Sequence, residues 1–233
     1  MEKLILLRWR APDTEPDTEE LLAAADRLCR AGHWVTAYVE HTGDAAAFRY
    51  GTDDDGIVLS SAVTVWVDRV ESAGAVVDHL PTTARTAGYL VTESVPREWQ
   101  RRDWVDGIPS PGVSLLTTFP RLDGIDDSTL FERWHGSHSA LTFAVHPVQR
   151  YVRNSVTRRL TEGAPASDAI VTESFSARDL LDPSRFYGVG EPDVGWRDAM
   201  AQIDADLRTF ADMDRLQTAP TEEILLAAAP WER

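Results

Sequence analysis

Three of the six histidines of this chain fall within one short segment, at His135, His138 and His146. If this segment is a helix turning about 100° per residue, Trp134 and Leu141 lie on its apolar stripe and His138 borders that stripe. A histidine in this position loses part of its hydration and titrates near neutral pH, so we predict that His138 can donate or accept a proton. The alternative is a surface histidine hydrogen-bonded to a neighbour.

Metal binding and nucleophilic catalysis are the main competing chemistries. Glu132 and His135 form one Glu-x-x-His unit of the kind used in di-iron bundles, but the chain has no second such unit and no HExxH motif. We therefore predict no metal site. Ser137 and Ser139 lack the strand-to-turn setting of a nucleophilic serine. Cys29, the only cysteine, excludes an intrachain disulfide and fits a small core residue of a helix.

The elements that would position these residues follow one order twice. In the first half, strands are predicted at 4–9, 34–41, 62–67 and 88–95, with helices at 18–30 and 70–80. In the second half, strands are predicted at 112–120, 149–158, 169–175 and 221–227, with helices at 128–145 and 196–210. Both halves thus read β-α-β-β-α-β, which is typical of the ferredoxin-like fold.

We therefore predict an α+β protein with a degenerate N-terminal half at 1–100, a linker at 101–111 and a C-terminal half at 112–233. One face of each four-stranded sheet would remain bare, and a bare apolar face is unstable in water. The two ferredoxin-like halves are accordingly expected to pack sheet to sheet, as an intramolecular dimeric α+β barrel with its helices outside.

Charge and composition exclude several classes of partner. The net charge of -15 makes a general attraction to nucleic acid or to an anionic membrane improbable. No signal segment or long apolar run is seen, so we expect a cytoplasmic protein. Gly188-Val189-Gly190 lacks the third glycine and the preceding strand of a dinucleotide-binding loop, so no nucleotide cofactor is expected.

The segment around His138 resembles the EthD family of dimeric α+β barrel proteins. The resemblance rests on Trp134, on His138 four residues later, and on a strand carrying Tyr151 and Asn154 in a Tyr-x-x-Asn pattern. It covers the second half from 112 to about 227, and the first half only by element order. Ser139-Ala140 replaces the Gly-Pro that usually follows the family histidine, which affects the local helix geometry.

The resemblance implies a barrel cavity that binds a hydrophobic or aromatic small molecule without any cofactor. His138, with Tyr151 and His135, would be catalytic, and Trp134, Asn154 and Arg153 would bind substrate. On a regular strand Tyr151 faces the side opposite to Asn154, so both line one cavity only if a bulge intervenes. The alternative for Tyr151 and Asn154 is a purely structural role.

The predicted activity is a cofactor-free lyase or isomerase reaction, such as decarboxylation, dehydration or cyclisation, on an aromatic or polyketide-like molecule. Two alternatives remain open: a non-catalytic protein that binds or delivers a hydrophobic metabolite, and a cofactor-independent monooxygenase. A homodimer of the two-half chain also remains open.

Overall fold

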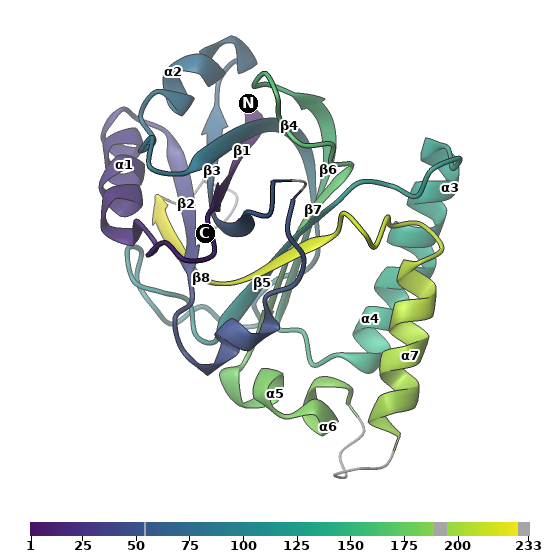
Figure 1. Ribbon diagram of the computed structural model, residues 1–233. Coiled ribbons are helices and arrows are strands. Elements are labelled where there is room, and N and C mark those ends of the chain that lie inside the picture. The colour runs from purple at the N-terminus through teal and green to yellow at the C-terminus, as the bar shows by residue number, and fades with distance from the viewer. Residues whose placement is uncertain (54, 189–194, 228–233) are drawn as a thin grey trace.

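The chain folds into one closed barrel of eight antiparallel strands with helices on its outside (Figure 1). The structure is a computed structural model, which describes residues 1–53, 55–188 and 195–227. Around the barrel the strand order is β1-β3-β2-β8-β5-β7-β6-β4. The strands are β1 (Glu2–Arg10), β2 (Trp34–Glu40), β3 (Val58–Val67), β4 (Arg85–Arg97), β5 (Val113–Phe119), β6 (Arg150–Arg159), β7 (Ala169–Phe175) and β8 (Gln217–Ala227).

The helical segments are short, apart from two. They are α1 (Thr18–Arg30), η1 (Asp44–Phe48), η2 (Val70–Ser72), α2 (Ala73–Val77), α3 (Asp127–Phe131), η3 (Glu132–His138), α4 (Ser139–Val145), α5 (Ala177–Leu181), α6 (Pro183–Phe186) and α7 (Trp196–Leu207). The predicted helix at 18–30 is confirmed with the same bounds. The helix predicted at 70–80 is instead a 3-10 turn followed by the five residues of α2. No described helix combines the length and the apolarity needed to cross a membrane.

The prediction of two ferredoxin-like halves packed sheet to sheet is wrong. Instead of two stacked sheets, the structure has a single sheet that closes on itself, because β2 pairs with β8 and β4 pairs with β6. A stacked pair would leave the backbone groups of four edge strands without partners. Edge-to-edge pairing satisfies those groups, and the apolar faces that were expected to stack line the interior of the barrel.

Alternation along the strands separates the barrel interior from its outer face. On β1, Ile5, Leu7 and Trp9 point inward, and their interior cluster includes Leu116 of β5 and Ile170 of β7. The interior is therefore largely filled by side chains from all parts of the chain.

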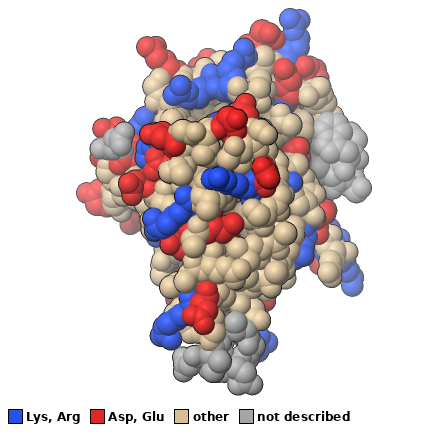
Figure 2. Space-filling model, turned by 90° about the vertical axis from the view of Figure 1, so that its right-hand side faces the viewer, with Lys and Arg blue, Asp and Glu red and all other residues tan. Residues whose placement is uncertain are grey.

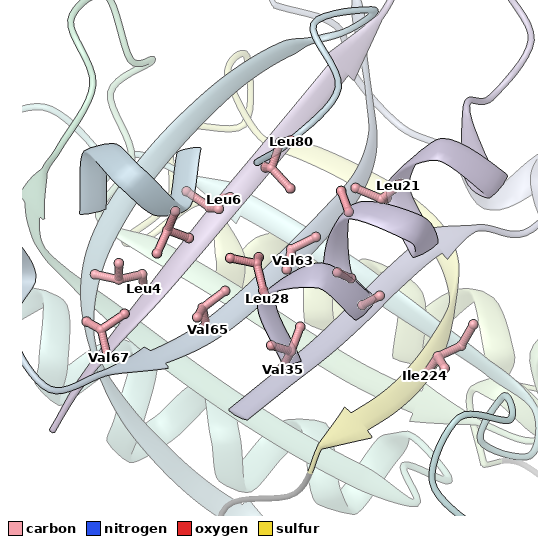
Figure 3. Close-up of a cluster of buried hydrophobic side chains, with 14 of the residues drawn as sticks. Leu4, Leu6, Leu21, Leu28, Val35, Val63, Val65, Val67, Leu80 and Ile224 are labelled. Atoms are coloured by element: carbon pink, nitrogen blue, oxygen red, sulfur yellow. The ribbon is translucent and has the colours of Figure 1, made fainter. Parts of the chain in front are cut away.

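A first layer covers the outer face of β1, β2 and β3 (Figure 3). We call it the N-terminal layer; α1 supplies Leu21, Ala24, Ala25 and Leu28 to it, all of them buried. These side chains pack on alternate strand residues such as Leu4, Val35, Val63 and Val65. The spacing of the apolar residues on α1 matches the helical period, which is why this helix could be predicted well.

A second layer covers the outer face of β5, β6 and β7 and lies on the right in Figure 1. We call it the C-terminal layer; it consists of α3, η3, α4 and α7. The segment η3 is a π-helix, and the hydroxyl of Ser139, the first residue of α4, donates to the carbonyl of Trp134 in η3 at 2.9 Å. The wider turn keeps Trp134, His138 and Thr142 on the buried side, while Leu141 is only half-buried. The apolar stripe expected from a regular helix is therefore shifted.

Candidate functional site

A cavity of about 150 Å³ lies between the outer face of the barrel and the C-terminal layer. Strands β5, β6, β7 and β8 form one wall, and η3, α4 and α7 form the other. It is thus outside the barrel, whereas the sequence predicted a site within a barrel cavity. A mainly apolar space of about 150 Å³ is enough for one aromatic ring. Its polar lining comprises His138, Thr142, His146, Tyr151 and Glu173, with Thr117 and Thr218.

His138 is oriented by a carboxylate from another helix. Its Nδ1 lies 2.7 Å from Oδ2 of Asp206 on α7, and its ring packs edge-on against Phe210. A carboxylate only accepts hydrogen bonds, so the proton of the neutral ring lies on Nδ1 and the lone pair lies on Nε2. The closest polar neighbour of Nε2 is the Thr142 hydroxyl, at 3.4 Å.

Burial lowers the pKa of His138 below its ordinary value, although the hydrogen bond and charge of Asp206 act in the opposite direction. The imidazole is consequently neutral at neutral pH. A neutral imidazole with an unprotonated Nε2 and a carboxylate behind Nδ1 has the arrangement of a general base.

Glu173 brings a carboxyl group to the outer face of β7. It lies directly opposite Tyr151 on β6 and Leu115 on β5, facing the cavity. No ion pair with a basic side chain is found for Glu173 in the described part of the chain. Removal from water therefore raises its pKa to about 7. Near neutral pH this group exchanges between acid and carboxylate, so it can give up or take a proton.

Tyr151 and Trp134, both predicted site residues, do line this cavity. Tyr151 is buried and packs edge-on against Phe143. Burial and, secondarily, the charge of Glu173 raise the pKa of Tyr151, so its hydroxyl stays protonated. The indole of Trp134 packs edge-on against Phe119 and forms part of the apolar wall.

The other three predicted residues do not line the cavity. The His135 ring lies tilted against Trp134, its pKa is lowered to about 4 by burial and then by the charge of Arg153, and its Nε2 is buried without a hydrogen-bond partner. Arg153 donates to the Ser139 hydroxyl at 2.8 Å and to the carbonyl of His135, so it fastens η3 to β6. Asn154 is buried on the opposite face of β6 and donates to the carbonyl of Ile170.

Three residues of the site were not assigned a role from the sequence: Glu173 and His146, which line the cavity, and Asp206, which lies behind His138. Glu173 carried a usable signal, because it shares one strand face with apolar Val171 and Phe175. Asp206 carried none, since its partner His138 is 68 residues away in the chain. His146 was noted only as part of the cluster; its Nδ1 bonds the carbonyl of Phe186 at 2.7 Å, and burial lowers its pKa to about 4.

No group of three or more His, Cys, Asp or Glu side chains is placed to hold a metal ion within residues 1–53, 55–188 and 195–227. Of the segment Gly188-Val189-Gly190, judged above not to be a nucleotide-binding loop, positions 189 and 190 lie outside the described residues.

Figure 2 shows the side of the molecule that carries the C-terminal layer. Charged side chains of both signs are interspersed over its upper part, and a broad area without charged residues lies below them. This side of the molecule therefore does not present a surface of one charge sign to an approaching ligand.

Comparison with known proteins places the fold but not a family. No protein-family model and no curated protein matches the chain, so membership of the EthD family is not supported beyond the motif resemblance. A crystal structure of an anthrone oxidase-like protein is similar, with a TM-score of 0.50 and 12% identity over 98% of this chain and 96% of that one. At that identity the similarity extends to the overall fold alone.

Proposed function

We propose that the cavity beneath η3, α4 and α7 binds a small aromatic molecule and moves a proton on it. The observation that carries this proposal is the pair formed by His138 and Asp206: the imidazole of His138, unprotonated at Nε2, lines the same cavity as Glu173. Nε2 of His138 would remove a proton from carbon next to a carbonyl group. Protonated Glu173 and the Tyr151 hydroxyl would donate hydrogen bonds to the oxygen on which negative charge develops.

Return of the proton to another atom completes an isomerisation, and loss of a leaving group from the same enolate completes a lyase reaction. The residues present supply the acid, the base and the hydrogen bonds that these reactions need. The volume of about 150 Å³ favours a one-ring substrate over a larger polyketide-like one.

The test is hydrogen exchange at carbon, which needs no knowledge of the natural product. Phenylacetone, a one-ring ketone with acidic C–H bonds, is incubated with the protein in D₂O and followed by proton NMR. The wild type should accelerate deuterium uptake, and exchange catalysed by His138→Asn should be at least about a hundredfold slower. His79→Asn, which changes a histidine just after α2 and outside the cavity, is the matched control.

Binding must be measured in parallel by ligand-observed NMR. Full exchange activity in His138→Asn would refute the proposed base. Binding of ring compounds that is abolished by filling the cavity, without exchange of any ketone by the wild type, would instead identify a binding or delivery protein.

A second candidate is suggested by the similarity to the anthrone oxidase-like protein. Removal of a proton from an activated CH₂ group leaves a carbanion that dioxygen can oxidise to a carbonyl, with water as the second product. Oxygen consumption with anthrone as the probe and no added cofactor tests this candidate. A three-ring molecule needs more than about 150 Å³, so α7 would have to move outward.

A further inference from the structure

A second cavity lies at one end of the barrel and takes no part in the chemistry proposed above. Its volume is about 280 Å³, nearly twice that of the cavity beneath the C-terminal layer. The walls come from the ends of strands that meet at this end of the barrel and from the loop between β6 and β7. They include Trp9, Arg85, Tyr89, Phe119, Pro165 and Gln217.

Hydrogen bonds hold the walls of this cavity in place. The Trp9 indole donates to Oε1 of buried Gln217 at 2.8 Å. The Tyr89 hydroxyl donates to the carbonyl of Pro165 at 3.0 Å, and Arg85 donates to the carbonyl of Gly163 at 2.9 Å. The loop that forms the rim is thus fastened to β4 at two points, so the cavity exists before any ligand binds.

The opposite end of the barrel is closed by the linker between the two halves. The amide of Gly107 donates to the carbonyl of Leu225, and the amide of Ser110 donates to that of Glu223. Beneath this segment Arg150 pairs with Glu223 at 2.6 Å. The two ends therefore differ: one is occupied by an ion pair and covered by backbone, and the other holds the larger cavity.

The polar groups of the cavity define the ligand. Because an indole N–H can only donate, the atom of Gln217 facing Trp9 must be its oxygen, which directs the amide NH₂ group away from Trp9. That NH₂ group is a donor for an acceptor oxygen. Two arginines line the cavity: Arg85 is paired with Asp53 at 2.7 Å and with Asp55, and Arg215 is paired with Asp212 at 2.7 Å, so both charges are compensated. An uncharged ligand fits this balance better than an anion.

We propose that this cavity is a second small-molecule site, which binds an uncharged, flat aromatic molecule carrying a carbonyl oxygen. The ring system lies against Trp9, Tyr89 and Pro165, and the carbonyl accepts a hydrogen bond from the Gln217 amide. A volume of about 280 Å³ suits two fused rings. Among the described residues that line the two cavities, Phe119 is common to both, so a shift of this residue is one way in which occupancy of one site can reach the other.

The experiment compares two probes that differ in the carbonyl alone, 1-tetralone and tetralin, by calorimetry and ligand-observed NMR. Ala166→Trp places a large side chain at the rim and should weaken binding of both probes at least tenfold. Ala75→Trp, at an exposed alanine on α2, is the matched control and should bind as the wild type does.

Gln217→Met keeps the side-chain length but removes the amide donor together with the oxygen that accepts from Trp9. Tetralin, which has no carbonyl, reports the effect of any change in the wall; beyond that effect, the variant should weaken 1-tetralone about three- to tenfold, as expected for one hydrogen bond. Ile203→Trp fills the cavity beneath the C-terminal layer and should leave 1-tetralone binding intact, which separates this site from the proposed catalytic one. Equal binding by Ala166→Trp and the wild type, or loss of binding in Ile203→Trp, would overturn the proposal.

Discussion

The N-terminal and C-terminal layers cover opposite sides of one barrel but are built differently (Figure 1). In the N-terminal layer, α1 lays Leu21, Ala24, Ala25 and Leu28 directly on the strands. In the C-terminal layer, the buried side of η3 and α4 includes His138 and Thr142, and α7 has no buried residue at all. Burying polar groups costs stability unless they are hydrogen-bonded. The first layer therefore serves packing, and the second gives up packing for a lined cavity.

The difference has a local cause in the backbone. Helix α1 is regular, so its apolar residues stay on one stripe. The π-helical turn of η3 admits an extra residue per turn, and π-helical turns are frequent at functional sites. Arg153 of β6 supports the turn from below through Ser139 and the carbonyl of His135. The π-turn is thus part of how His138 is aimed at the cavity.

The largest effect is expected from Leu28→Ala in the N-terminal layer. Leu28 is 1% exposed, so its truncation should lower the free energy of unfolding by about 4 kcal/mol, measured in urea. Exchange activity on phenylacetone should not change, because Leu28 lies in the other layer.

Leu207→Ala in the C-terminal layer is the matched variant. Leu207 is half-buried and lines the cavity, so its truncation should cost roughly 1–2 kcal/mol and admit larger ketones. Equal stability losses in the two variants, with no change in ligand size, would contradict the contrast between a packed and a hollowed layer.

A somewhat smaller effect should follow from Glu173→Gln, through the pH dependence of stability. The pKa of Glu173 is about 7 in the folded chain and 4.5 in a solvated carboxyl, so the folded state holds this proton more tightly. The wild type therefore loses stability as pH rises from about 4.5 to 7, by roughly 3 kcal/mol from this group. The free energy of unfolding of Glu173→Gln should not show this decrease between about pH 4.5 and 7, because a glutamine does not titrate.

The measurement is urea unfolding of both proteins at pH 5 and pH 8. His146, whose pKa is lowered to about 4, contributes with the opposite sign below pH 6.5, but this contribution is shared and cancels between the two proteins. Parallel pH profiles for the two proteins would show that Glu173 is ionised normally.

The smallest effect is expected from Asp206→Asn. Asp206 orients His138 and raises its pKa against the effect of burial, so its removal should lower the pKa of His138 further. The part of the pH profile in which the exchange rate rises with pH should move to lower pH. The plateau rate should fall about tenfold, which corresponds to an increase of about 1.4 kcal/mol in the activation free energy. Asp206→Glu should restore the profile in part; an unshifted profile would remove Asp206 from the mechanism.

Much of the secondary structure followed from the sequence because it depends on short-range periodicity. The bounds of α1 and β7 were predicted as observed, and the alternation on β6 correctly set Tyr151 on the face opposite to Asn154. The helix after β5 was predicted as regular. The Ser139-Ala140 departure from the family motif lies in α4, directly after the π-turn, and did not predict that turn.

The sequence by itself determined the eight strands and α1, the acidic charge and the segment in which the histidines gather, since composition and local periodicity specify these directly. The tertiary structure decided that the strands close edge to edge into one barrel, because backbone hydrogen bonds between β2 and β8 and between β4 and β6 join residues far apart in the chain. It also decided the site: the meeting of His138 with Asp206, and the burial that raises the pKa of Glu173, exist only after α7 and β7 are packed together with η3.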